Sequence, residues 1–467
     1  MRYLCQDKPW QECEQAQGKH IIRVYPLPTD IVRLDGTTAS SHVEPTIGSI
    51  FQKGLSCDHR PDLAQVKIML ASLDPLGWTD ATQVVDGNEA DDPLYKPAIE
   101  QVRSILNKEG VLYVGDCKMG ASSIRASIEK ANDYYLMPLP ATIVSAEVID
   151  VYLTPVGSPS PTIEPIYHMN DNGEMREIAK GFEINEIVTG EVDGETKSWT
   201  ERRLVVCSFK HAQAIEPALN KRLKKAKKEI ADLTRPRSGY KCITTLDEFW
   251  PAVNGILKKY NVEGLLEIDA FESTIEKHCR RYRDKPARVE IKHVLDVHFQ
   301  DNEVALGATK KRFGWRVYAT NAPIEKLSLD DAVLAYRDEY IIERGFGRLK
   351  GKPLSLTPMY LQRDDHATGL IRLLTIGLRV LTLLEFVVRS KLDEARTDIA
   401  GLYAGNPKRS TTRPTAEALL GAFSYIDLIG IEEVDGISYH LTPLTALQQY
   451  ILELLGFSSE IYTQLME

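Results

Sequence analysis

The stretch from residue 31 to residue 140 constrains the fold more than any other part of the chain, because short apolar runs and helical patterns alternate there in a fixed order. In chain order it predicts strands at 31–36, 66–72 and 82–87, a helix at 93–110, a strand at 111–116, a helix at 123–132 and a strand at 134–140. Three strands without a helix between them, followed by alternating strands and helices, are typical of a mixed sheet flanked by helices. The sequence therefore predicts an α/β fold here.

The residues after 140 show a different pattern of predicted strands and helices. Residues 141–312 combine runs typical of antiparallel strands, a hairpin turn at 192–195 and a charged helix at 214–233. This change of pattern favours a separate β-rich insertion domain, after which a strand at 314–321 is expected to return to the first sheet. The predicted domains are a short N-terminal segment (1–22), the first part of the core (23–140), the β-rich insertion with its basic helix (141–312), the second part of the core (313–397) and a C-terminal helical and hairpin unit (398–467).

Charge and cysteine content exclude some classes of protein. The formal net charge is −9 at pH 7, so a nucleic-acid partner would need local basic patches. The most apolar segment, 369–390, carries Arg372, Arg379, Glu385 and Arg389, which favours a buried core helix over a membrane span. The seven cysteines are scattered and form no CxxC pair, which is typical of reduced thiols in a cytoplasmic protein and argues against a zinc site.

Three acidic residues are candidates for a metal-dependent reaction. Asp35 ends a predicted strand in IVRLDG, and Asp116 ends the next strongly apolar strand in VLYVGD. Carboxylates at the ends of neighbouring strands can point into one crevice, where they repel each other unless a cation lies between them. Mg²⁺ favours such hard oxygen ligands. Glu343, on a helix predicted to begin near Ser328, is the third acid, which would allow two Mg²⁺ ions about 3.5–4 Å apart to act on a phosphodiester.

Each acid also has a purely structural interpretation. The LDG sequence at Asp35 is common in turns, and an aspartate after an apolar strand, such as Asp116, is a frequent helix N-cap. A glutamate among cations, such as Glu343, often lies on a solvated ion-pair face. The catalytic interpretation therefore depends on the three positions together.

Basic side chains are candidates for contact with DNA. Those around Glu343 are expected to hold backbone phosphates beside the metal ions: Arg344, Arg348, Lys350 and Lys352. Three further basic clusters lie at 221–228, 277–288 and 310–316, and their candidate contacts are Lys224, Lys225, Lys228 and Arg312. Each of these clusters is equally consistent with a solvated helix or loop face.

The segment YRDEYIIERGFGRLK resembles the signature Y-x2-R-x3-E-x6-K of DDE transposases from bacterial insertion sequences, the IS-four group and its close relatives. Tyr336, Glu343 and Lys350 stand at the matching Tyr, Glu and Lys positions. The position of the signature arginine holds Glu339, with Arg337 two residues before it. The phosphate contact that the resemblance assigns to this arginine is therefore in doubt.

The resemblance extends over about residues 25–395. LDGTTAS resembles the first-aspartate strand, VVDGNEADD the turn before the first core helix, YVGDCKMGASSI the second-aspartate segment and RDDHATGLIRLLTIGLRVL the helix that closes the core. It implies an RNase H-like core interrupted by a β-rich insertion. The 227 positions from Asp116 to Glu343 agree with an insertion, since they are far too many for a loop.

The same resemblance implies a function. Asp35, Asp116 and Glu343 would be catalytic and would bind two Mg²⁺ ions, with Mn²⁺ able to substitute. The enzyme would cut double-stranded DNA at the transposon ends, and the freed 3′-OH would attack target DNA. Tyr336 and Arg337 would contact the DNA, and the working form would be a homodimer on paired ends, away from any membrane.

Two other functions are consistent with the sequence. The chain could be a catalytically silent DNA-binding remnant of a transposase, which Glu339 at the arginine position favours. It could also be a nuclease of the same fold that does not carry out strand transfer. Divalent-dependent cleavage and joining of pre-cut ends would separate the three.

Overall fold

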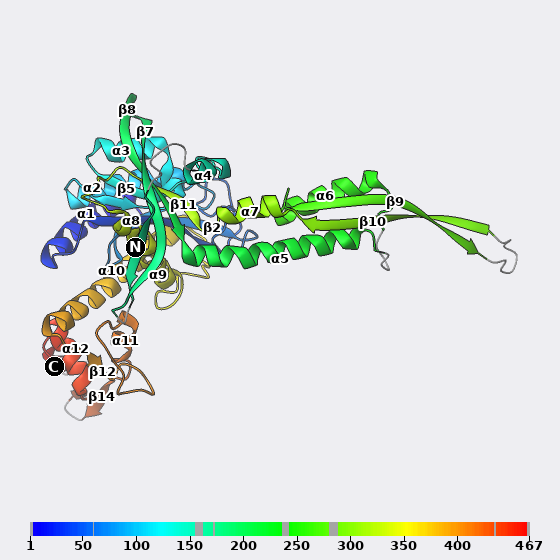
Figure 1. The fold of residues 1–467 in the computed structure, drawn as a ribbon. Coiled ribbons are helices and arrows are strands. Elements are labelled where there is room, and N and C mark those ends of the chain that lie inside the picture. The colour runs from blue at the N-terminus through cyan, green and yellow to red at the C-terminus, as the bar shows by residue number, and fades with distance from the viewer. Residues whose placement is uncertain are drawn as a thin grey trace. The chain divides into compact units, whose positions relative to one another are not determined.

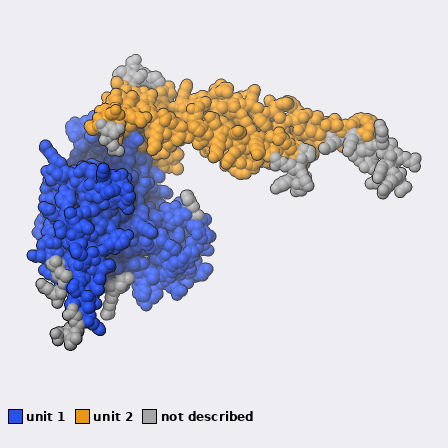
Figure 2. Space-filling view, turned by 90° about the horizontal axis from the view of Figure 1, so that it is seen from below, with its two compact units in different colours: residues 1–138, 185–202, 319–467 blue, residues 139–184, 203–318 orange. Residues whose placement is uncertain are grey.

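The computed structural model describes residues 3–58, 60–154, 162–170, 173–235, 242–279, 288–433 and 436–464. The chain divides into two compact units (Figure 2): unit 1 comprises Met1–Pro138, Asn185–Arg202 and Ala319–Glu467, and unit 2 comprises Leu139–Ile184 and Arg203–Tyr318. Unit 2 begins and ends close to the predicted boundaries at 141 and 312, although 185–202 belong to unit 1. That this region is an insertion into the core stays a prediction.

Nine strands form one mixed sheet in the order β3-β2-β1-β4-β5-β11-β8-β7-β6. They are β1 (Ile31–Ser41), β2 (Ala64–Leu73), β3 (Trp78–Asp86), β4 (Leu112–Val114), β5 (Tyr134–Pro138), β6 (Glu164–Met169), β7 (Met175–Val192), β8 (Glu195–Ser208) and β11 (Trp315–Thr320). β1 is antiparallel to β2, and β2 to β3, whereas β4 is parallel to both β1 and β5. The predicted α/β fold with a mixed sheet is confirmed.

The helices of unit 1 are α1 (Asp7–Val24), α2 (Asp92–Leu106), the short 3-10 helix η1 (Cys117–Gly120), α3 (Ser122–Lys130), α8 (Leu329–Arg337), α9 (Tyr340–Lys350), α10 (Asp364–Ala395), α11 (Ala416–Gly421), α12 (Ala446–Leu455) and α13 (Glu460–Thr463). Within unit 1, some helices lie beside the sheet, whereas α11 and α12 pack against the end of α10 (Figure 1). Every residue of β2 is buried, including the polar Gln65 and Lys67, as expected for a strand covered on both faces. One core of unit 1 joins β1 and β2 to α9 and α10 through residues that include Ala39, Val66, Ile68, Ile342, Phe346, Ile371 and Leu378.

The N-terminal segment is a helix, which the sequence analysis did not predict. α1 buries Trp10 and Glu14, and the backbone at Gly18 lies close to α2. A carbon added at Gly18 would lie 2.6 Å from Cγ2 of Ile105. The helix was missed because its sequence is polar and its buried face has few apolar side chains.

The segment from Ser328 to Lys350 contains two helices where one was predicted. The Ser328 side chain caps α8 by accepting a hydrogen bond from the backbone N–H of Asp331. α8 ends at Arg337, and α9 begins at Tyr340 after a two-residue turn. The turn separates Tyr336 from Glu343, which the signature placed on one element.

The apolar segment 369–390 lies within α10, as predicted for a core helix. Its charged residues Arg372, Arg379 and Glu385 are buried and make ion pairs. Among the helices in the described part of the chain, none is long and apolar enough to cross a membrane.

Unit 2 contains more helix than the predicted β-rich domain. Its further elements are α4 (Ala146–Leu153), α5 (Phe209–Leu233), α6 (Leu246–Tyr260), α7 (Glu303–Lys311) and the hairpin of β9 (Leu266–Cys279) and β10 (Arg288–Asp301). α5 was predicted, but α6 was not, and the two pack against the hairpin around Phe249. The predicted turn between β7 and β8 is confirmed, with Asp193 and Gly194 both at positive φ as a two-residue hairpin requires.

The C-terminal elements follow the predicted order of helix, hairpin and helix. α11 precedes the hairpin of β14 (Leu428–Glu433) and β15 (Gly436–Leu441), and α12 follows it. The sequence also predicts that this hairpin turns at Asp435 and Gly436, and Asp435 lies outside the described residues. Val388 and Leu392 at the end of α10 pack with Leu419 and Ile451. The polar segment 403–415, which its sequence predicts to be a linker, contains β13 (Ser410–Thr411), and this strand pairs with β12 (Ile399–Ala400).

Candidate functional site

Asp35 and Asp116 come together because β1 and β4 are parallel neighbours. The pairing of these strands ends at Arg33 and Val114, and each aspartate lies two residues further along the chain. Asp116 follows β4, as predicted. Asp35 lies inside β1, which continues to Ser41 because it also pairs with β2. The prediction that Asp35 ends its strand is therefore wrong, although it stands just beyond the pairing with β4.

Both aspartates line a small cavity of unit 1, about 20 Å³ in volume, which we call the acidic cleft. Its other polar lining residues are Arg33, Tyr336 and Glu339. The same two aspartates also line a second hollow of about 220 Å³. The carboxylates thus stand where an ion in the acidic cleft and a larger ligand in the second hollow could both reach them.

Hydrogen bonds fix one oxygen of each aspartate. Oδ1 of Asp116 accepts from the hydroxyl of Tyr95 at 2.6 Å and from the backbone N–H of Lys118 at 2.8 Å, which makes Asp116 the N-cap of η1. Oδ1 of Asp35 accepts from the N–H of Gly36 at 2.7 Å. Within the described residues all hydrogen bonds to these two carboxylates go to Oδ1, so Oδ2 of each remains for another ligand.

The acidic cleft disfavours negative charge. Burial raises the pKa of Asp35 to about 7, and the charges of Asp116, Glu339 and Asp91 add to this effect against the hydrogen bond from Gly36. A proton or a cation in the acidic cleft would relieve this repulsion.

The third predicted acid, Glu343, is not among the residues that line the acidic cleft. It is exposed on the first turn of α9, while Glu339, one turn earlier, lines the cleft beside Tyr336. The structure therefore brings together two of the three predicted acids and adds Glu339. The signal for Glu339 was present in the sequence, as the acid that replaces the signature arginine.

The chemistry of the acidic cleft suits a hard cation, but the ligand set is incomplete. In the described part of the chain, no three His, Cys, Asp or Glu side chains are grouped so that they could hold a metal ion. Asp35 and Asp116 supply two carboxylates of the kind that Mg²⁺ prefers. Glu339 lines the acidic cleft with these two aspartates, and Asp91 lines the second hollow with them.

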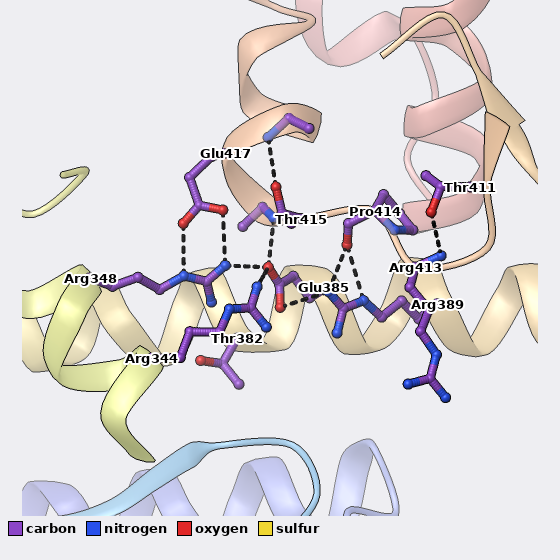
Figure 3. A network of polar contacts seen from close by, with 12 residues as sticks. Arg344, Arg348, Thr382, Glu385, Arg389, Thr411, Arg413, Pro414, Thr415 and Glu417 are labelled. Atoms are coloured by element: carbon purple, nitrogen blue, oxygen red, sulfur yellow. Dashed lines mark hydrogen bonds and ion pairs between the residues drawn. The ribbon is translucent and has the colours of Figure 1, made fainter. Parts of the chain in front are cut away.

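Two of the predicted phosphate contacts on α9 have partners within the protein. Arg348 is buried, and its guanidinium donates to Glu385 and, through Nε at 2.7 Å, to Glu417 (Figure 3). Arg344 is partly exposed and donates to the same oxygen of Glu385. These ion pairs give both side chains a structural role that the sequence analysis did not predict.

The other predicted contacts near Glu343 are more accessible. Nζ of Lys350 donates to Oδ1 of Asp58 at 2.7 Å and is partly exposed. Arg337 and Lys352 are exposed. All three could meet a ligand without a change in the fold, although Lys350 would have to exchange its partner.

The predicted basic contacts of unit 2 lie on α5 and after α7. Three lysines of α5 are exposed: Lys224, Lys225 and Lys228. Nε of Arg312 is 3.3 Å from Oδ1 of Asp150, so this arginine has an acidic partner. Most of the predicted cluster 277–288 lies outside the described residues.

Comparisons with known proteins give little further information. No family model matches the sequence, and no curated protein matches it. Among solved structures, the chain is similar to a piggyBac transposase in a cryo-EM structure of its synaptic complex with hairpin DNA, with 9% sequence identity and a TM-score of 0.23. The similarity covers 76% of this chain and 54% of that chain, so this chain spans about half of that protein. A TM-score this low does not establish a shared fold.

Proposed function

We propose that this protein is a Mg²⁺-dependent DNA transposase with an RNase H-like core, which cuts transposon-end DNA and joins the freed 3′-OH to target DNA. The observation that carries the proposal is the meeting of Asp35 and Asp116 at neighbouring parallel strands, each with Oδ2 available. The signature around Glu343 supports the proposal independently, because it was identified from a different part of the sequence.

In this proposal, Asp35 and Asp116 hold the metal ions together with an acid from the start of α9. Bound Mg²⁺ would activate the attacking oxygen and stabilise the leaving oxygen of the phosphodiester. Tyr336 lines the acidic cleft and would position the DNA strand, and the exposed Arg337 and Lys352 would contact phosphates. The lysines of α5 would contact DNA in the same sequence-independent way.

The test is cleavage of duplex DNA made from the sequences that border the gene, with Mg²⁺ or Mn²⁺. We expect Asp35→Asn and Asp116→Asn to lose cleavage, while Asp86→Asn, an exposed aspartate at the end of β3, keeps it. Cleavage that survives Asp116→Asn would refute the assignment of the site. Absence of any divalent-dependent cleavage would favour the silent DNA-binding remnant.

Two variants would show which acid is the third metal ligand. The resemblance assigns the role to Glu343, whereas the lining of the acidic cleft favours Glu339. Loss of cleavage in Glu343→Gln alone would mean that α9 moves when DNA and metal bind, and loss in Glu339→Gln alone would mean that the acidic cleft is already arranged for catalysis.

Strand transfer and assembly need their own measurements. Supplying pre-cut ends with free 3′-OH groups should give joined products, and their absence alongside intact cleavage would favour a nuclease without strand transfer. A homodimer on paired ends should appear as two protein chains per two DNA ends in light scattering.

A further inference from the structure

Unit 1 contains a further cavity, of about 280 Å³, bordered by α9, α10, the turn between β2 and β3 and the segment that follows β13. We call it the arginine cavity, because four arginines line it: Arg344, Arg348, Arg389 and Arg413. Its volume is near the lower end of the about 300–1,000 Å³ of small-molecule sites. Among the described residues, none lines both this cavity and the acidic cleft.

A single buried carboxylate serves three of these arginines. Oε1 of Glu385 accepts from Arg344 and Arg348, and Oε2 lies 3.2 Å from the guanidinium of Arg389 (Figure 3). Oε1 also accepts the backbone N–H of Ala416 at 2.8 Å, so its capacity to accept hydrogen bonds is used. Nε of Arg389 also donates to the carbonyl of Pro414, at 3.0 Å (Figure 3). Each guanidinium carries five N–H donors, so these acceptors do not use all of the donors of the three arginines.

The other acidic residues near the arginine cavity do not neutralise all four arginines. Glu417 pairs with Arg348, and Asp393 lines the cavity. Arg413 is exposed, and within the described ranges no carboxylate pairs with its guanidinium, which Figure 3 shows directed away from Glu385. Three carboxylates thus face four guanidinium groups, which leaves the cavity positively charged.

The crowding of positive charge affects Arg389 in particular. Burial lowers the pKa of the Arg389 guanidinium, and the neighbouring charges of Arg344, Arg348 and Arg413 lower it further against the attraction of Glu385. An anion that entered the cavity would relieve this repulsion.

We propose that the arginine cavity binds a backbone phosphate of a DNA strand, at a site separate from the acidic cleft. A planar guanidinium matches the oxygens of a phosphate in a bidentate arrangement, and Arg389 and Arg413 approach the cavity from different segments of the chain. Tyr340, which is 59% exposed and lines the same cavity, offers a ring on which a sugar or base packs. The inference rests on the proposed function in taking DNA as the ligand, and it adds Arg389, Arg413 and Tyr340 to the contacts.

The experiment measures how binding of a short fluorescent duplex DNA depends on salt, by anisotropy and without divalent ions. The test variant is Arg413→Gln, because this side chain is exposed and its loss leaves the ion pairs of Glu385 intact. The matched control is Lys391→Gln, which removes one exposed positive charge from α10 outside the cavity. We expect Arg413→Gln to lower the slope of log K against log salt by about 0.9 and to weaken binding several-fold, with the control unchanged.

The outcomes separate this proposal from its alternatives. Equal slopes for the two variants, or no binding of duplex DNA by the wild type, would overturn it. If inorganic phosphate raises the unfolding temperature of the wild type more than that of Arg413→Gln while the DNA slopes stay equal, the cavity holds a free phosphate, and the DNA assignment is overturned. Arg413-dependent binding without any divalent-dependent cleavage would support this site and refute the proposed function, and cleavage with equal slopes would do the reverse.

Discussion

The buried carboxyl group of Asp80 leads to a quantitative prediction about stability and pH. Asp80 is fully buried in β3, and within the described residues no cation makes an ion pair with its carboxyl group. The guanidinium of Arg379 nearby is already engaged by Glu14, by Gln17 at 2.7 Å and by the carbonyl of Thr79 at 2.8 Å. Two buried acids therefore share one cation, which disfavours ionisation of both.

Burial raises the pKa of Asp80 from 3.8 to about 7, and the charge of Glu14 adds to the effect against the attraction of Arg379. Since the native protein holds this proton more tightly than the unfolded chain, it binds more protons between about pH 4 and pH 7. The stabilisation is fully present below about pH 4 and is lost as the pH rises through 7. A shift of about three units corresponds to about 4 kcal/mol of unfolding free energy lost over this interval.

The perturbation is Asp80→Asn, which keeps the shape of the protonated side chain and cannot ionise. Native-state hydrogen exchange of α1 and β3 gives the free energy of opening around this site at several pH values. We expect the wild type and Asp80→Asn to agree near pH 4 and to diverge by on the order of 4 kcal/mol at pH 8, with the variant more stable. The control is Asp86→Asn, an exposed aspartate of the same strand, which should follow the wild type. Parallel pH profiles for wild type and Asp80→Asn would refute the reasoning.

Three further changes test other contacts of the fold. Gly18→Ala places a carbon 2.6 Å from Cγ2 of Ile105, so we expect a loss of about 1–3 kcal/mol in the opening free energy of α1 by hydrogen exchange, and an unchanged value would contradict the close packing. Arg348→Met leaves Glu385 with one partner fewer in a buried site, and denaturant unfolding should show a loss of about 3–5 kcal/mol, whereas a stability within about 0.5 kcal/mol of the wild type would show that the other arginines suffice. Phe249→Ala leaves a cavity in the core between α5 and α6. Calorimetry should show that the free energy of unfolding of unit 2 falls by about 3–5 kcal/mol. A shift of the unit 1 transition alone would contradict this expectation.

The alternation of strands and helices from residue 31 to residue 140 was predictable because local patterns determine it. β2 is mostly apolar, with Gln65, Lys67 and Ser72 as exceptions, and the helical period of α2 begins near Pro93 and ends before Gly110. Element types and approximate bounds therefore follow from a few neighbouring residues. α1 was not predictable in this way. Its buried Glu14 depends on Arg379, a residue 365 positions away, which no local pattern reveals.

The candidate site was also predictable only where neighbouring residues determine it. The meeting of Asp35 and Asp116 followed from the rule that neighbouring parallel strands end at the same edge of a sheet. The exchange of Glu343 for Glu339 at the acidic cleft did not follow, because it depends on the turn between α8 and α9. The sequence also does not reveal that Arg348 is buried in an ion pair with Glu385 whereas Arg413 is exposed.

Helix α9, which carries the signature around Glu343, borders both the acidic cleft and the arginine cavity. Ile342 lines the acidic cleft, while the adjacent Ile341 and Arg344 line the arginine cavity, so two faces of one helix border two cavities of opposite charge. Under the proposed function the two cavities would hold different phosphates of the DNA, and Glu385 fixes the guanidinium groups of Arg344 and Arg348 at the border of the arginine cavity.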